Sequence, residues 1–201
     1  CISMNPVMQS FAITVKKYQL PQELIDSFLL SMNADLSKNK YDTTLELDNY
    51  IHGSANVVGL MCLIVFLDGD MTKYKNLKQP AMKLGAAFQK VNFLRDLKAD
   101  TQQLNRLYFP DVDIDNFTEE TKQTLIKSIE ADFDEAEKGI KQLPGKSKLA
   151  VYIAFSYYKK LLHKLKKTPA DEIIKTRIRV KDSTKFFLLG KAYMKYKLNI
   201  I

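Results

Sequence analysis

Residues 84–100 read LGAAFQKVNFLRDLKAD, and this stretch decides the fold. At about 100° per residue, four of its polar side chains fall on one line of a helix: Gln89, Asn92, Asp96 and Asp100. The far side of the same helix carries an apolar stripe: Leu84, Ala87, Phe88, Val91 and Leu94. We expect a helix that packs against a core with its apolar side and presents carboxylate and amide side chains to a cavity on the other side.

The two aspartates of this helix lie one turn apart, so their carboxylates point the same way. Two like charges at i and i+4 cost roughly a few tenths of a kcal/mol in an isolated helix. Taken alone, the pair Asp96 and Asp100 fits a solvated acidic face best. The alternative is that a cation, or a substrate that carries one, lies between them.

Composition indicates a globular protein. The chain has 201 residues, of which 46% are hydrophobic and 27% charged, enough for one domain over residues 1–201. Two cysteines give no disulfide framework, and Cys62 in an apolar run predicts a buried, reduced thiol. We therefore expect a cytoplasmic protein. A first residue of Cys instead of Met, without a signal segment, indicates a fragment or a processed product.

Basic residues gather towards the C-terminus. Residues 141–201 hold 16 Lys and Arg against 3 Asp and Glu, a balance of +13, whereas the whole chain has a net charge of +8. This third is suited to an anionic membrane surface, nucleic acid or a polyanionic ligand. Solvated helix faces are the simpler interpretation. No recognition motif supports nucleic-acid binding, which we do not expect.

Periodicity predicts an all-α protein with seven or eight helices, because no segment shows sustained alternation of apolar and polar residues. The first three predicted helices cover residues 5–18, 21–36 and 44–67, and a fourth begins near residues 79–80. The later ones cover 122–142, with Thr118 as N-cap, 148–165 and 183–198, with a short helix after Pro169. Residues 104–110 are expected to be irregular, and 111–117 to form a loop.

The helix expected over residues 44–67 ends in an almost wholly apolar run, VVGLMCLIVFL (57–67). Eleven residues are too few to span a bilayer, so this helix belongs at the centre of a bundle. Small residues precede the run at 53–55 and recur at Gly59. They allow close approach of either a neighbouring helix or a ligand.

These residues together resemble the phytoene synthase/squalene synthase family. The line from Gln89 to Asp100 resembles its second aspartate-rich motif, and RLYFP (106–110) its Arg-x-Tyr-x-Pro element. The segment YIHGSANVVGLM (50–61) is similar to its Tyr-x-Tyr-x-Val-Ala-Gly-x-Val-Gly segment. YKKLL from Tyr158 and RIRV from Arg177, with Lys185 beyond it, resemble its C-terminal elements. The order and spacing agree over nearly the whole chain.

The resemblance implies an isoprenoid synthase-type helical bundle with a central cavity. It implies a Mg²⁺-dependent prenyltransferase, with Mn²⁺ as an alternative metal, that joins two prenyl diphosphates head to head through a cyclopropyl intermediate. Asp96 and Asp100 become catalytic metal ligands, and Tyr50 a catalytic residue facing the reacting carbons. The remaining substrate-binding positions are Ser54, Gly59, Gln89, Asn92, Tyr158, Arg177 and Lys185. Tyr157 next to Tyr158 is an alternative for that position.

Within the family, we expect a phytoene synthase that uses geranylgeranyl diphosphate in carotenoid formation. The alternatives are a squalene or dehydrosqualene synthase using farnesyl diphosphate, with NADPH needed only for squalene, and a non-catalytic member acting through protein partners. The hydrophobic tails of the substrates and the hydrophobic products imply peripheral contact of the protein with a membrane.

The sequence also departs from the family pattern. His52 and Asn56 replace the usual Tyr and Gly, which affects the shape of the cavity near Tyr50. The family's first aspartate-rich motif has no counterpart before Asp96. We therefore expect the chain to correspond to roughly the C-terminal two thirds of the family domain and to be inactive alone, because one carboxylate cluster cannot hold two diphosphates.

Overall fold

The computed structural model describes residues 3–110 and 112–201, and within these ranges the chain is helical without a strand. In chain order the elements are α1 (Pro6–Tyr18), α2 (Gln22–Ala34), α3 (Thr44–Ile51), the π-helical turn η1 (His52–Asn56), α4 (Val57–Phe66), α5 (Met71–Leu104), α6 (Glu119–Ile140), α7 (Gly145–Lys167), α8 (Ala170–Ile173) and α9 (Asp182–Lys197). The prediction of an all-α protein is confirmed, with nine α-helices in the described residues instead of seven or eight.

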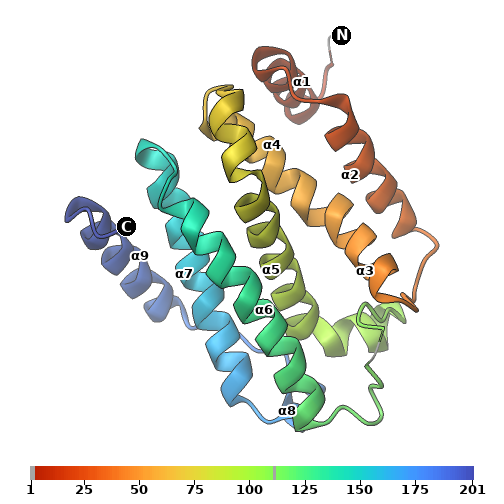
Figure 1. The fold of residues 1–201 in the computed structure, drawn as a ribbon. Helices are drawn as coiled ribbons and strands as arrows, with labels where there is room; N and C mark the ends of the chain where they lie inside the picture. The colour runs from red at the N-terminus through yellow and green to blue at the C-terminus, as the bar shows by residue number, and fades with distance from the viewer. Residues whose placement is uncertain (1–2, 111) are drawn as a thin grey trace.

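Helix α5 lies at the centre of the bundle, with α2, α3 and α4 on one side of it and α6, α7 and α9 on the other (Figure 1). It contacts α3, η1, α4, α6, α7 and α8. The predicted apolar stripe forms part of the core, since Ala87, Val91 and Leu94 are wholly buried. Leu84 and Phe88 are only partly buried, because they face the cavity described below.

The predicted start of this helix near residue 80 is wrong. Helix α5 begins at Met71, where the carboxylate of Asp70 accepts hydrogen bonds from the backbone N–H groups of Thr72 and Lys73 and so caps the helix. Pro80 lies inside the helix instead of opening it. A Cβ added at Gly139 of α6 would lie 2.4 Å from the Cβ of Pro80, so α6 packs closely against the proline.

The two N-terminal helices begin and end close to the predicted residues, but they pack less than expected. Helix α1 has the predicted N-cap, Asn5, and no buried residue. Val7 and Ile13 are more than half exposed, and so is Leu29 of α2. Helical periodicity identified an apolar face on each helix. Leu24 and Phe28 of α2 pack in a core cluster with α4, but within the described residues no element covers Val7, Ile13 or Leu29.

Helices α3, η1 and α4 run on from one another, as expected for residues 44–67. Together they form the one described segment, Thr44–Phe66, that is long and apolar enough to cross a membrane, and half of its most apolar window is buried inside the protein. Leu60, Leu63 and Ile64 pack in a core cluster with α2 and α5. The run therefore lies between α2 and α5, beside the central helix, and only one side of it is buried, so the predicted central position is confirmed only in part.

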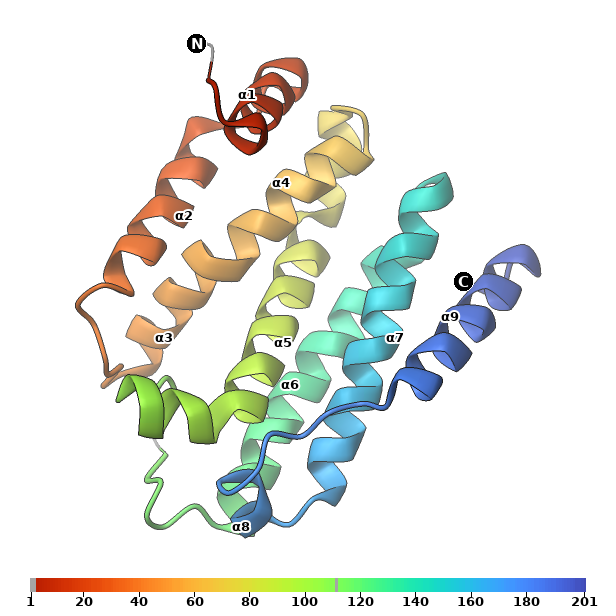
Figure 2. The same ribbon diagram turned by 180° about the vertical axis from the view of Figure 1, so that it is seen from behind.

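The C-terminal helices also follow the prediction, with α6 capped by Thr118. Lys122 of α6 is 1% exposed, and its ammonium donates to the carbonyl oxygens of Thr168 (2.6 Å) and Lys166 (3.3 Å). These carbonyls end α7, where a cation is favourable. After α8, residues 174–181 cross the bundle to reach α9 (Figure 2).

Candidate functional site

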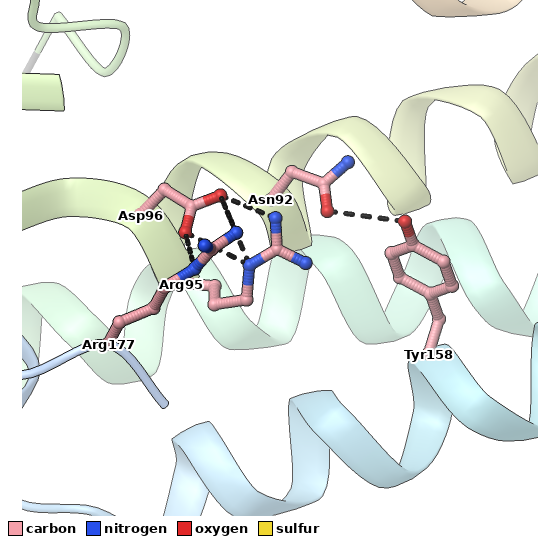
Figure 3. Close-up of polar contacts among 5 residues, drawn as sticks. All are labelled: Asn92, Arg95, Asp96, Tyr158 and Arg177. Atoms are coloured by element: carbon pink, nitrogen blue, oxygen red, sulfur yellow. Dashed lines mark hydrogen bonds and ion pairs between the residues drawn. The ribbon is translucent and has the colours of Figure 1, made fainter. Parts of the chain in front are cut away.

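The polar line of α5 makes a different cross-helix contact at each of three successive positions. The amide nitrogen of Gln89 donates to the hydroxyl of Ser54 in η1 at 3.4 Å. Tyr158 of α7 donates its hydroxyl to the amide oxygen of Asn92 at 3.2 Å. The Nε of Arg177, from the segment after α8, lies 2.6 Å from Oδ1 of Asp96. The three contacts thus join six residues, and Figure 3 shows two of these contacts, Tyr158 with Asn92 and Arg177 with Asp96.

A cavity of about 500 Å³ lies between α4, α5, α6 and α7. Most of its wall is apolar, with side chains such as Val58, Phe66 and Phe88. Its polar groups come from the predicted residues Ser54, Gln89, Asn92 and Tyr158, and Gly59 forms part of the wall. The volume lies within the range of roughly 300–1,000 Å³ typical of small-molecule sites. Five predicted substrate-binding residues therefore line one cavity.

Cys62 also faces this cavity and is exposed. The prediction that it is buried in a core is wrong, because α4 turns this side of its apolar run towards the hollow instead of a neighbouring helix. The surrounding apolar wall still raises the pKa of the Cys62 thiol.

The π-helical turn η1 sets the wall beside α5 and was not predicted from the sequence. Such turns occur frequently at functional sites. Here small residues allow two close approaches. A Cβ on Gly53 would lie 2.0 Å from Oγ of Ser31 in α2, and one on Gly85 would lie 2.8 Å from the carbonyl oxygen of Ala55. The small residues thus allow helices to approach each other, and at Gly59 they also shape the cavity.

Two arginines converge on the Asp96 carboxylate. Arg95, a neighbour that sequence reasoning passed over, contacts both oxygens, with Nε at 3.1 Å from each. Arg177 also contacts both oxygens, with Nε 2.6 Å from Oδ1 and Nη2 3.4 Å from Oδ2. Asp100 lies one turn further along α5, where burial and the charge of Asp96 raise its pKa to about 6. The end of the polar line therefore combines two carboxylates with two guanidinium groups.

This donor set fits a Mg²⁺ ion that arrives with a diphosphate. Asp96 and Asp100 offer hard oxygens from one face of α5, and Mg²⁺ commonly binds one or two carboxylates together with substrate phosphates. The described residues contain no cluster of three or more His, Cys, Asp or Glu side chains that would hold a metal alone. Burial, and after it the charge of Asp96, raise the pKa of Asp100, and a cation bound between the carboxylates would offset both effects.

Tyr50 lies away from this cavity. Its ring is buried among Tyr41, Phe93 and Tyr108, and its hydroxyl donates to Oδ1 of Asp35 at 2.8 Å. Burial and this hydrogen bond raise the pKa of Tyr50. The ring instead lines a second hollow of about 350 Å³ beside α2 and α3. The structure therefore places Tyr50 outside the cavity that five other predicted residues line.

Sequence reasoning missed Asp35, which joins Tyr50 to the RLYFP element. Nη1 of Arg106 lies 3.4 Å from Oδ1 of Asp35, and Nη2 donates to the backbone carbonyl of the same residue at 2.8 Å. Arg106 also donates to the hydroxyl of Tyr108 at 3.1 Å. The only signal in the sequence was the resemblance at residues 106–110, which does not extend to Asp35.

Lys185 is the other predicted residue that the structure leaves apart. It lies in the first turn of α9, where it pairs with Asp182 at 2.9 Å and lies over the ring of Tyr157. Asp182 raises the pKa of Lys185. The described contacts bring Lys185 to α7, but not to Asp96 or Asp100.

Comparisons with solved structures agree with this fold. A dehydrosqualene synthase matches with a TM-score of 0.80 at 20% identity, covering 98% of this chain and 72% of that one. The squalene synthase HpnC from Alicyclobacillus acidocaldarius matches with a TM-score of 0.70 at 20% identity, covering 82% and 66%. The predicted isoprenoid synthase-type bundle is confirmed.

Sequence comparisons lead to the family. The chain is 28% identical to the chloroplastic phytoene synthase of Daucus carota, covering 92% of this chain and 50% of that one. It is 27% identical to the phytoene synthase of Arthrospira platensis, covering 84% and 62%. The chain thus spans about half the length of such relatives. A family model described as squalene/phytoene synthase matches residues 2–184. The chain belongs to the squalene/phytoene synthase family.

Proposed function

We propose that this chain binds a prenyl diphosphate as part of a prenyltransferase that joins two such molecules head to head. One observation carries the proposal: an apolar cavity leads, along one line of α5, to two carboxylates and two arginines. A prenyl diphosphate has the same division, with a long apolar tail and a polyanionic head. The tail matches the cavity, and the head matches the Asp96–Asp100 end.

The roles of the residues follow from their chemistry. Asp96 and Asp100 would hold Mg²⁺, which when bound neutralises the diphosphate as negative charge develops on it. Arg95 and Arg177 add guanidinium groups, whose forked geometry suits phosphate oxygens. The amides of Gln89 and Asn92 orient the head group at the cavity mouth. The apolar wall keeps water away from the allylic carbon that becomes cationic when the diphosphate leaves.

The proposed substrate is geranylgeranyl diphosphate and the proposed product phytoene, formed through a cyclopropyl diphosphate. The phytoene synthases among the relatives support this choice. Farnesyl diphosphate, leading to squalene or dehydrosqualene, is the alternative. The solved structures with a similar fold include a squalene synthase and a dehydrosqualene synthase, which is why we keep this alternative. In the described residues one carboxylate pair faces the diphosphate end, so we propose that the chain alone binds one diphosphate without joining two.

The test is calorimetric titration of the 201-residue chain with the unreactive thiolodiphosphate analogues of geranylgeranyl and farnesyl diphosphate, with and without Mg²⁺. We expect one Mg²⁺-dependent site and tighter binding of the longer analogue. Extraction after incubation with the true diphosphates should give no condensed hydrocarbon. Absence of binding would refute the proposal and favour a non-catalytic member of the family, in which Arg95 and Arg177 simply neutralise Asp96.

We also propose peripheral contact with an anionic membrane through α9. Its outward face exposes aromatic and apolar side chains, with Phe186 and Phe187 each more than two-thirds exposed. Lysines at 185, 191 and 195 flank that face, an arrangement typical of interfacial helices. Co-sedimentation should require phosphatidylserine in the vesicles and be lost in Phe186→Ser/Phe187→Ser. The control Leu29→Ser/Leu30→Ser, on an apolar face without lysines, should still sediment; equal loss in both would refute α9 as the contact.

A further inference from the structure

The segment that carries Arg177 has no regular secondary structure. Residues 174–181 connect α8 to α9 across the bundle (Figure 2). Ile178 and Val180 are buried in the main core, whereas Arg177 and Arg179 are exposed. This alternation is that of an extended chain. Backbone–backbone hydrogen bonds reach this segment only at its two ends, where for example the N–H of Thr176 donates to the carbonyl of Glu172 at 2.9 Å, and none involves residues 177–180 among those described. The position of Arg177 therefore depends on side-chain contacts.

Two lysines provide such contacts on either side of Arg177. Nζ of Lys98, from α5, donates to the backbone carbonyl of Lys175 at 2.6 Å. Nζ of Lys164, from α7, donates to the backbone carbonyl of Arg179 at 2.7 Å. Both acceptors lie two residues from Arg177, one on each side. Hydrogen bonds from a charged donor are stronger than neutral ones, so the segment is tied to both helices at its arginine.

We infer that Lys98 and Lys164 are positioning residues that hold Arg177 where it meets the diphosphate head group. Without ligand, the held guanidinium contacts Asp96. With a diphosphate between the carboxylates, the same position presents two N–H donors to its oxygens. If the segment were not held, Arg177 would have to become ordered when the diphosphate binds, and this cost in entropy would weaken the affinity for the diphosphate. The inference rests on the proposed function and assigns these two lysines a part in it.

The experiment measures the affinity for geranylgeranyl thiolodiphosphate with Mg²⁺ in Lys98→Met/Lys164→Met. We expect Kd to rise about tenfold, while Lys98→Arg/Lys164→Arg, which keeps a charged donor at each place, binds within about threefold of the unsubstituted chain. The matched control is Lys175→Met. It removes one lysine charge close to Arg177, from the connecting segment itself, but its ammonium pairs with Asp171 at 2.8 Å and holds no carbonyl.

Two further measurements separate positioning from general effects. In an Arg177→Ala background, the lysine substitutions should cause no further loss, because they act through that side chain. Persistent loss in that background would mean that the lysines attract the diphosphate directly, and would overturn the inference. Amide hydrogen exchange in residues 176–180 of the ligand-free chain should accelerate in Lys98→Met/Lys164→Met and not in Lys175→Met.

The binding measurements distinguish failure of the proposed function from failure of the inference. If the unsubstituted chain binds no diphosphate, the proposed function fails, and with it the role of the lysines towards that ligand, whatever the exchange shows. If it binds and Lys98→Met/Lys164→Met binds equally well, the proposed function stands and the inference is wrong. Unchanged exchange in the double variant also overturns it, because the lysines then do not hold the segment. Equal thermal midpoints of the variants confirm that each is folded.

Discussion

Replacing Asp100 with Asn should stabilise the ligand-free chain and weaken its binding of Mg²⁺ and diphosphate. The pKa of Asp100 is raised from 3.8 to about 6 by burial and by Asp96. At about 1.4 kcal/mol per unit, this corresponds to roughly 3 kcal/mol at neutral pH. Because the side chain is partly exposed, solvent screening reduces the expected gain to about 1.5 kcal/mol. Asn has the same shape without the charge.

The effect of Asp100→Asn on the free energy of unfolding should depend on pH. The folded chain holds the Asp100 proton up to about pH 6, whereas the unfolded chain releases it near pH 4. The carboxyl therefore disfavours folding increasingly as pH rises between these values. Urea unfolding in the presence of a chelator should show no gain for Asp100→Asn below pH 4 and the full gain above pH 7.

An exposed aspartate provides the control for these urea titrations. Asp48→Asn makes the same change on an exposed position of α3 and should alter the free energy of unfolding by less than about 0.5 kcal/mol at any pH. If Asp100→Asn destabilises the chain at pH 7, the carboxylate is stabilised by its surroundings instead of strained by Asp96. The interpretation of the pair as a cation site would then lose its physical basis.

Three other substitutions or probes test the packing around the site. Lys122→Met should lower the free energy of unfolding by about 2 kcal/mol in urea titrations, because it leaves the carbonyls at the end of α7 without their buried donor; no loss would contradict the capping role. Gly85→Ala should destabilise by about 1–3 kcal/mol through contact with the Ala55 carbonyl, whereas Gly190→Ala, with open space around it, should stabilise by up to about 1 kcal/mol; equal effects would refute the close approach. Alkylation of Cys62, followed by mass spectrometry, should be slowed by bound geranylgeranyl thiolodiphosphate, and unchanged labelling at saturation would place the tail elsewhere.

Local periodicity was sufficient to predict the helices and the polar line of α5. Gln89, Asn92 and Asp96 lie on one face because of helical geometry alone, and the structure supplies each with a partner. The start of α5 could not be predicted in the same way. Pro80 usually marks a helix boundary, but the Asp70 cap and the packing of Gly139 against the proline outweigh that preference.

Exposure and tertiary contacts were harder to predict, because they depend on which elements meet. Cys62 and Leu29 are apolar residues on helical faces, and no local signal shows that the first faces a cavity and the second faces solvent. Asp35 could not be linked to Tyr50 and Arg106 because the three residues are far apart in sequence. Arg95 was missed for another reason: it was treated as part of a motif instead of a partner for Asp96.

The most direct test is a crystal structure of the 201-residue chain with Mg²⁺ and geranylgeranyl thiolodiphosphate. We expect one prenyl chain in the cavity between α4 and α7, with its diphosphate joined through metal to Asp96 and Asp100 and contacted by Arg177. A tail in the second hollow beside Tyr50, or a diphosphate bound away from both aspartates, would contradict it.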